Sequence, residues 1–188
     1  YSNRVNAFSA DDQELLQELA ILAAKVIQNT WLYEQLRLKV MLFESLSSVS
    51  RTINSTLNLD EALRVITKEA AQLMRAGMCS LMLLDESREW LDLRASFGAG
   101  HAYIKKPRLG TAESLIGVVV RRKKALQVAN VQTDARYQNV EVARREGLVS
   151  LLSVPLIFAG QSIGALNVYT AKPYSFSNEE IRILSALA

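Results

Sequence analysis

The chain has 188 residues, of which 49% are hydrophobic and 22% are charged, a composition typical of a globular protein. Its net charge of +3 arises from 22 basic and 19 acidic residues, and this weak balance argues against nucleic acid as a partner. The longest apolar runs, Leu115–Val120 and Val154–Ala159, are far shorter than the ~20 residues of a membrane-spanning helix. A single cysteine forms no disulfide within the chain, so we expect a reducing, cytoplasmic location.

The two ends of the chain resemble each other. Residues 1–20 (YSNRVNAFSADDQELLQELA) align without a gap with residues 169–188 (YTAKPYSFSNEEIRILSALA). Ser9 and Ser177 coincide, both can cap a helix, and acidic residues follow each of them. The repeat predicts two copies of one module, the first represented only by its last strand and final helix. The alternative is chance similarity between two amphipathic helix starts. We expect the chain to be part of a longer protein.

A long helix is predicted after Ser9, because no Pro or Gly occurs from Asp11 to about Leu57. Heptad-like spacing connects Leu19, Leu22, Val26, Asn29, Tyr33, Leu36, Val40 and Phe43. A continuous helix of about 45 residues would run ~70 Å, too far for one small domain to cover its apolar stripe. We therefore expect a parallel homodimer, with the polar Asn29 fixing the register. The alternative is two helices, broken near Asn29, that pack on the domain itself.

A shorter helix and a β-hairpin are predicted next. The helix covers Leu59–Arg75, with Asn58 or Asp60 as its cap. Met78–Leu84 is a nearly continuous apolar run, and Trp90–Phe97 alternates apolar and polar residues after a polar turn. This pattern is typical of two strands joined as a hairpin.

The segment 98–147 is irregular by comparison. We expect one strand, Ala125–Asn130, and one short helix, Leu115–Arg121, capped by Thr111 or Ser114. A stretch of this length with so little regular structure inside a compact domain is usually functional.

Regular structure is predicted again over Ser150–Phe158 and Ser162–Thr170, with a closing helix that opens at Ser177. Pro155 predicts a bulge or an unpaired side of its strand, and Gly164 predicts a close backbone approach. Because hairpins pair antiparallel, the fold class is α+β with an antiparallel sheet. We place the helices on one face and the irregular segment on the other, where it encloses a pocket.

At these positions the sequence resembles the GAF family of sensory domains. The resemblance rests on LGT at 109–111 with SLIGVV at 114–119, NVQTDARY at 130–137, GLVSLLSVPL at 147–156, and IGALNV at 163–168 followed by FSNEE at 176–180. We assign residues 42–188 to a GAF domain. Residues 1–41 are assigned to the last strand, exit helix and connecting coiled-coil helix of a preceding GAF-like domain.

The resemblance implies a profilin-like sheet of six antiparallel strands, preceded by the long helix. It also implies a small-molecule pocket under the irregular segment and dimerisation through the entry and exit helices. Members of the family bind cyclic nucleotides, tetrapyrroles, haem, amino acids or 2-oxo acids, and some bind nothing. They commonly precede histidine kinases, diguanylate cyclases, phosphodiesterases or transcription activators, so we expect an output domain in the same polypeptide.

The expected pocket combines a helix N-terminus near residues 111–114, which favours an anionic or carbonyl group, with a few polar contacts. Its candidate residues are Ser96, Phe97, Thr111, Ser114, Ile116, Tyr137, Val149, Ser150 and Ser153. For each of them, the alternative is a role in packing the cover or capping a turn.

Catalysis finds little support in the residue inventory. The one histidine, His101, has glycine neighbours and predicts a surface position, whereas the one cysteine, Cys79, begins an apolar strand. No cluster offers the about four ligands of a metal site. The family's methionine sulfoxide reductases need at least two thiols, and its bilin-binding members carry their cysteine in the pocket cover, so neither activity is expected. Val168 follows Asn167 where cyclic-nucleotide-binding members have lysine, which weakens that assignment.

The basic run Arg121–Lys124 lies at a predicted helix C-terminus, where cations are favourable. We interpret it as a solvated helix end. The alternative is that Lys105, Lys106 and Arg108 extend it into a patch for an acidic partner.

We therefore interpret the chain as a non-catalytic sensory and relay module of a bacterial cytoplasmic signal-transduction protein. A small ligand of unknown identity would alter the irregular segment and the last strand, and would thereby shift the closing helix against a dimer partner. One alternative is a ligand-free dimerisation spacer whose pocket is closed by bulky side chains. A further alternative is a cyclic-nucleotide-binding regulatory domain.

Overall fold

The computed structural model describes residues 9–55 and 59–188, except the side chains of residues 10, 13, 45–46 and 48–55. Its contacts divide the chain into two compact units, residues 1–43 and 44–188. The strand predicted for the preceding domain falls on residues 1–8, outside the described part.

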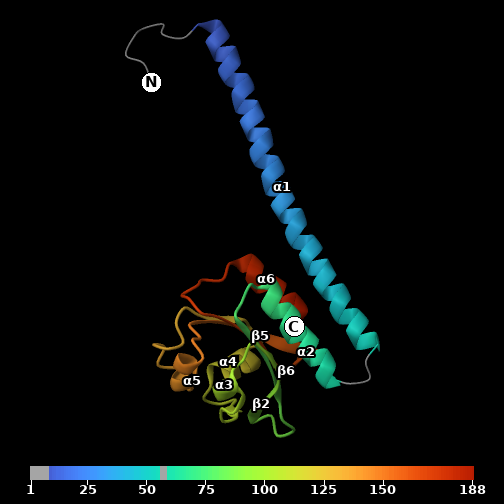
Figure 1. Ribbon diagram of the computed structural model, residues 1–188, viewed down its shortest axis with the longest axis vertical. Helices are drawn as coiled ribbons and strands as arrows, with labels where there is room; N and C mark the ends of the chain where they lie inside the picture. Colours follow the sequence, from blue (N-terminus) through green and yellow to red (C-terminus); the bar gives the residue numbers. More distant parts are fainter. Residues whose placement is uncertain (1–8, 56–58) are drawn as a thin grey trace. The chain divides into compact units, whose positions relative to one another are not determined.

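The first helix, α1, is continuous over Ala10–Ser55 (46 residues), which confirms the predicted long helix and excludes the alternative of a break near Asn29 (Figure 1). Ser9 caps it, because its Oγ accepts the Asp12 N–H at 3.2 Å and the Asp12 carboxylate accepts the Ser9 N–H at 2.8 Å. This reciprocal pair is a capping box and satisfies backbone donors that the first helical turn leaves open.

The folded domain is built on a mixed sequence of helices and strands. Its elements are α2 (Leu59–Leu73), β1 (Met78–Leu84), β2 (Trp90–Phe97), α3 (His101–Ile104), β3 (Leu109–Gly110), α4 (Leu115–Arg122), β4 (Leu126–Val128), α5 (Val140–Arg145), β5 (Ser150–Phe158), β6 (Gln161–Thr170) and α6 (Asn178–Leu187). The strands form one sheet in the order β3-β2-β1-β6-β5-β4, and every neighbouring pair is antiparallel. The predicted six-stranded antiparallel sheet of an α+β fold is confirmed.

The helices α2 and α6 cover one face of the sheet (Figure 1). Strand residues alternate between faces, so Cys79 and Leu81 of β1 point to this side and pack with Ala70 of α2 and Leu184 of α6. Ser177 closes the N-terminus of α6 with a second capping box, in which Glu180 plays the part that Asp12 plays in α1.

The opposite face is covered by residues 98–149, which we call the lid (Figure 1). The lid carries α3, α4 and α5, and its buried side chains pack on Met78 and Met82 of β1 and on Ala165 and Tyr169 of β6. The prediction of helices on one face and an irregular cover on the other is therefore confirmed. Two lid elements, α3 and β3, were not predicted from the sequence.

Close contacts hold β6 to its neighbours. A Cβ on Gly164 would collide with the carbonyl oxygen of Met82, which confirms the close approach expected there. Pro155 pairs with Ala165, and the register shift predicted near it lies one step further, between Leu156 and Ile157.

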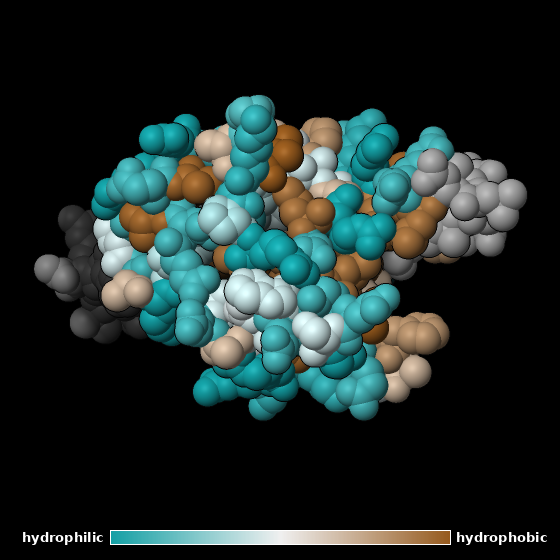
Figure 2. Space-filling view, turned by 90° about the horizontal axis from the view of Figure 1, so that it is seen from below, coloured by the Kyte–Doolittle hydropathy of each residue, from teal (hydrophilic) through white to brown (hydrophobic). Residues whose placement is uncertain are grey.

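The β1–β2 hairpin lies at the lower end of the domain in Figure 1. Figure 2 looks onto that end, where hydrophilic residues predominate and hydrophobic ones show between them. Among the described residues, no helix combines the length and apolarity needed to cross a membrane.

Candidate functional site

A chain of buried hydroxyl groups lies between the sheet and the lid. The Ser80 Oγ of β1 is hydrogen-bonded to the Tyr103 hydroxyl of α3 at 2.8 Å. Tyr103 donates to the Tyr169 hydroxyl of β6 at 3.4 Å, and Tyr169 is paired with the Tyr137 hydroxyl at 3.3 Å. Two lid segments are thereby joined to two central strands.

The same chain continues along the sheet to β5. Ser153 donates to the side-chain oxygen of Asn167 at 2.7 Å, and the Asn167 amide reaches both the Oγ and the backbone oxygen of Ser80 at 3.3 Å. We call the six side chains the hydroxyl network: Ser80, Tyr103, Tyr137, Ser153, Asn167 and Tyr169. None of the six is more than 8% exposed. A buried polar group without a partner costs free energy, so this network selects one arrangement of lid and strands.

The tyrosines of the network keep their protons at neutral pH. Burial, which disfavours the charged phenolate, raises the pKa of Tyr103, Tyr137 and Tyr169 above the ordinary tyrosine value. Each remains a neutral hydroxyl that can donate one hydrogen bond, so the network positions groups without carrying charge.

The space next to α4 is nearly filled. A cavity of about 10 Å³ remains there, enough for about one water molecule. Its lining residues are Leu109, Ser114, Leu115, Ile116, Tyr137, Gln138 and Asn139. Ser114 caps α4 by accepting the Gly117 N–H at 3.0 Å, and it donates to the Gly110 carbonyl at 2.6 Å. Ser114 therefore satisfies one of the backbone N–H donors at the start of α4.

A larger hollow opens at the edge of β2. It has a volume of about 400 Å³ and is open to solvent. We call it the Lys106 groove, and its lining residues are Met82, Leu91, Asp92, Leu93, Arg94, Ile104, Lys106, Pro107 and Arg108. The Lys106 ammonium lies 3.4 Å from the centre of the Tyr103 ring, and burial lowers the pKa of Lys106 to about 7.

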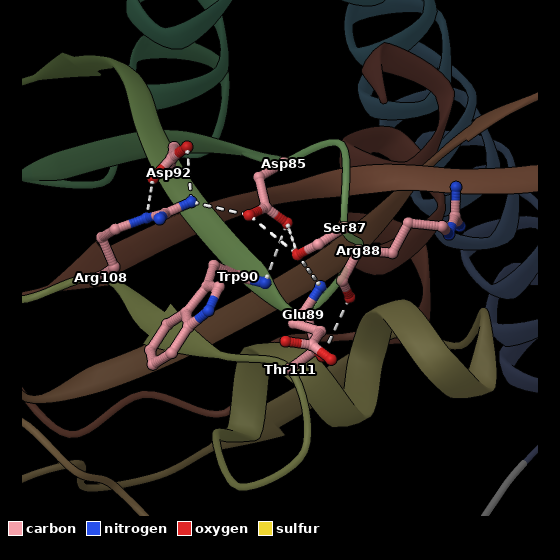
Figure 3. A network of polar contacts seen from close by, with 8 residues as sticks. All are labelled: Asp85, Ser87, Arg88, Glu89, Trp90, Asp92, Arg108 and Thr111. Carbon is pink, nitrogen blue, oxygen red and sulfur yellow. Dashed lines mark hydrogen bonds and ion pairs between the residues drawn. The ribbon is translucent and has the colours of Figure 1, made fainter.

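The lid is anchored to the β1–β2 hairpin, as Figure 3 shows. The Arg108 guanidinium binds the carboxylates of Asp92 at 2.5 Å and Asp85 at 3.0 Å. Thr111 adds two bonds, its N–H to the Glu89 carbonyl at 2.8 Å and its hydroxyl to the Arg88 carbonyl at 3.1 Å. These contacts hold the residues around β3 at a constant position on the sheet.

A carboxylate ties the two ends of the lid together. Glu146, just after α5, accepts the backbone N–H groups of Gly100, Ala102 and Tyr103 at 2.7, 2.9 and 3.2 Å. The first turn of α3 is thus satisfied by a residue far along the chain. Since Tyr103 is in this turn, the clamp also positions the hydroxyl network.

Some of the predicted pocket residues are brought together under the lid. Ser114, Ile116 and Tyr137 line the small cavity, and Ser153 is joined to Tyr137 through the hydroxyl network. Ser96 pairs with Ser80 across the hairpin, so it lies on the lid side of the sheet.

The remaining predicted pocket residues lie elsewhere. Phe97 pairs with Cys79, and this register puts it on the face that the helices cover. Ser150 donates to the Ala129 carbonyl at 2.7 Å and accepts the Tyr174 N–H at 2.7 Å, so it fastens two connecting segments. Thr111 is hydrogen-bonded to the β1–β2 hairpin. The Val149 N–H donates to the Thr170 carbonyl, and the Val149 carbonyl accepts the Val131 N–H.

Four members of the hydroxyl network were not predicted as site residues. Ser80 and Asn167 carried a signal, because each is a polar residue within an otherwise apolar strand. Tyr169 lies two residues after Asn167 in β6, so its position on the lid side follows from the alternation. Tyr103 could not be placed, since α3 has four residues and no apolar periodicity.

The two residues considered for catalysis are placed as expected. Cys79 is fully buried on the helix-covered face, and burial raises the pKa of its thiol far above the ordinary value. His101 is exposed at the start of α3. Among the described residues, no three histidine, cysteine or acidic side chains are grouped in a way that could hold a metal ion.

Comparisons with known proteins agree on one family. The sequence model described as GAF domain matches residues 56–188. The chain is similar to the GAF domain of a phosphoenolpyruvate-protein phosphotransferase from Coxiella burnetii, with 24% identity and a TM-score of 0.69 over 79% of this chain and 88% of that one. The corresponding domain from Acinetobacter gives 26% identity and a TM-score of 0.65 over 78% and 87%.

The same fold occurs in an enzyme. A free methionine-R-sulfoxide reductase from Neisseria meningitidis, solved with its substrate, shares 16% identity and gives a TM-score of 0.59 over 78% of this chain and 87% of that one. At this identity the likeness concerns the fold alone. No curated protein sequence matches the chain.

Proposed function

Because the chain belongs to the GAF domain family, we propose that it is a non-catalytic sensory and relay module of a cytoplasmic signalling protein. In this proposal a small ligand binds on the lid side of the sheet, and dimerising helices carry the change to an output domain in the same polypeptide. The GAF domains of phosphotransferases support such a role as one part of a larger protein.

The hydroxyl network is the observation that carries this proposal. It connects α3 and the turn at Tyr137 to β6, and β6 leads into the segment before α6. That segment is fastened at Tyr174 to Ser150, and at Phe176, whose N–H is accepted by Gln127 at 2.9 Å. A ligand that favours one arrangement of the lid would therefore change the strain on the start of α6, within the limit of its affinity difference between the two arrangements.

We further propose that α1 forms a parallel homodimer. The predicted seam residues Leu19, Leu22, Val26, Asn29, Tyr33, Leu36, Val40 and Phe43 are all exposed on the helix. Other apolar residues, such as Trp31 and Leu32, are also exposed. A helix with this much apolar surface requires a covering partner, and a second copy of the same helix supplies a matching seam.

The ligand-free spacer is kept as the second candidate because the cavity next to α4 holds only about one water molecule. Two bulky side chains, Leu115 and Tyr137, line this cavity. In the spacer, the hydroxyl network would serve stability alone.

One experiment separates the two candidates. A ligand present at about 100 times its dissociation constant stabilises a fold by ~2.7 kcal/mol, which for this size raises the melting temperature by roughly 5–10 °C. We expect such a rise for a compound in a metabolite and nucleotide panel, and its loss in Asn167→Leu but not in the surface variant Ser185→Ala.

The relay is tested with the same compound. A spin label at the exposed Arg182 of α6, introduced as Arg182→Cys, reports the distance between the two α6 helices of a dimer by pulsed EPR. Cys79 is buried and does not react with the label. A compound that raises the melting temperature should also change this distance; stabilisation with an unchanged distance argues against the relay, and no stabilising compound at all supports the spacer.

A further inference from the structure

The Lys106 groove has an apolar floor and a single cation that no carboxylate neutralises. Met82 and Leu91 form the buried part of the floor, and Leu93 packs beside them. Ile104 is 54% exposed at the groove although it is a large aliphatic residue. A hollow of about 400 Å³ lies within the range of small-molecule sites, and its lining combines aliphatic with charged side chains, which suits a ligand with a charged head and an aliphatic body.

The other charged groups of the groove are already paired. Arg108 is held by Asp85 and Asp92 (Figure 3), and Arg94 is held by Asp60 at 3.3 Å. Lys106 makes no ion pair or hydrogen bond through its ammonium within the described part of the chain; its contact is the face of the Tyr103 ring at 3.4 Å. A ring face stabilises an ammonium less well than a carboxylate does in a partly desolvated place.

We propose that Lys106 is an anion receptor, and that the Lys106 groove binds a small monocarboxylate with a short aliphatic body. The carboxylate takes the open position beside the Lys106 ammonium, and the aliphatic body lies on Met82, Leu91 and Ile104. This inference rests on the proposed sensory function and names the chemical class of its ligand and the group that recognises it.

A monocarboxylate fits this groove better than a phosphate or a nucleotide. With one unpaired ammonium, the groove balances a single negative charge, because its other cations already have carboxylate partners. Phosphate recognition uses several backbone N–H groups or several cations, and the N–H groups at the start of the nearby α3 are taken by Glu146.

Binding at Lys106 reaches the hydroxyl network through one residue. The ring of Tyr103 carries Lys106 on its face, while its hydroxyl is bonded to Ser80 and Tyr169. A carboxylate that draws the ammonium from the ring changes the position that Tyr103 prefers. The groove and the network thereby act as one site.

The test uses methyl NMR of the full chain with 13C-methyl methionine. The chain has four methionines, and Met82 is the one that lines the groove; Met82→Leu assigns its signal. The probes are 4-methylpentanoate, its neutral amide 4-methylpentanamide, and inorganic phosphate. The variants are Lys106→Met, which keeps an aliphatic stem without the charge, and Lys105→Met as the matched control at an exposed neighbour.

We expect 4-methylpentanoate to shift the Met82 methyl signal to saturation in the wild type and in Lys105→Met, and to leave it unmoved in Lys106→Met. The titratable and charged groups around Lys106 are Tyr103, whose ring touches the ammonium, and Asp92, Arg94 and Arg108, which line the same groove. Because the pKa of Lys106 is about 7, the apparent affinity should be about tenfold lower at about pH 8 than at about pH 6, in proportion to the charged fraction.

Other outcomes overturn the proposal. Equal shifts of the Met82 signal with 4-methylpentanoate and with its amide would mean that Lys106 does not recognise the carboxylate. Binding of phosphate but not of 4-methylpentanoate would mean that the groove recognises a different anion from the one proposed. Failure of all three probes to move Met82 would remove the groove as a site. The sensory function is judged separately: a panel compound that raises the melting temperature without moving Met82 would keep the sensor and refute the Lys106 groove.

Discussion

Replacing Asn167 by leucine tests whether the hydroxyl network stabilises the domain. The leucine keeps the branching and the number of side-chain heavy atoms but deprives the Ser153 hydroxyl of its acceptor and Ser80 of the amide donor. Losing these bonds at fully buried positions, with one hydroxyl left unsatisfied, should cost about 2–4 kcal/mol of unfolding free energy. For a chain of this size the melting temperature should fall by roughly 5–15 °C.

Urea unfolding followed by circular dichroism measures the cost and allows a double-mutant cycle. Ser153→Ala alone should cost about 1–2 kcal/mol, since it leaves the Asn167 oxygen without its donor. In the double variant the unsatisfied partner is gone, so the total should fall short of the sum by about 1 kcal/mol or more. Ser185→Ala on the exposed side of α6 is the control, with a change below about 0.5 kcal/mol. Equal costs for the two serine variants, or strict additivity, would refute the reasoning.

Three further predictions concern the lid clamp, the long helix and Lys106. Glu146→Ala should cost about 1–3 kcal/mol and speed hydrogen exchange at the start of α3, whereas Glu141→Ala on the exposed side of α5 should change neither. Leu22→Glu should convert a sedimenting dimer to a monomer, whereas Gln28→Glu outside the seam should not; a dimer in both would contradict the proposed interface. Lys106→Met should raise the free energy of unfolding below pH 7, with the gain shrinking as pH rises from about 7 towards 10.5, because the unfolded lysine binds its proton more strongly than the folded one; a pH-independent difference in urea unfolding would count against it.

The strands of the sheet could be predicted from the sequence because burial dictates their composition. β1 and β5 are covered on both faces and read as apolar runs, while the alternation in β2 marks a half-covered strand near the edge. The continuous α1 followed from the absence of Pro and Gly. In contrast, α3 depends on Glu146, a residue more than forty positions away, and β3 on pairing with β2, so neither has a local signal.

The candidate site was predicted only in part, for a reason of register. Successive strand residues point to opposite faces, so an error of one position transfers a residue to the other side of the sheet. Phe97 and Ser150 were assigned to the pocket, but Phe97 lies on the helix-covered face and Ser150 fastens connecting segments. Ser114, Ile116 and Tyr137 lie near one another, in a helix and a turn whose patterns are visible in the sequence.

Because α1 is unbroken from its cap at Ser9 to Ser55, the rotation of one end about the helix axis is fixed relative to the other end. Each residue inserted into such a helix turns everything beyond it by about 100° and displaces it by about 1.5 Å. The orientation handed from one end to the other is therefore encoded in a residue count. Lengthening or shortening by one heptad changes that orientation by only about 20°, whereas a change of one or two residues rotates it by about 100° or 200°.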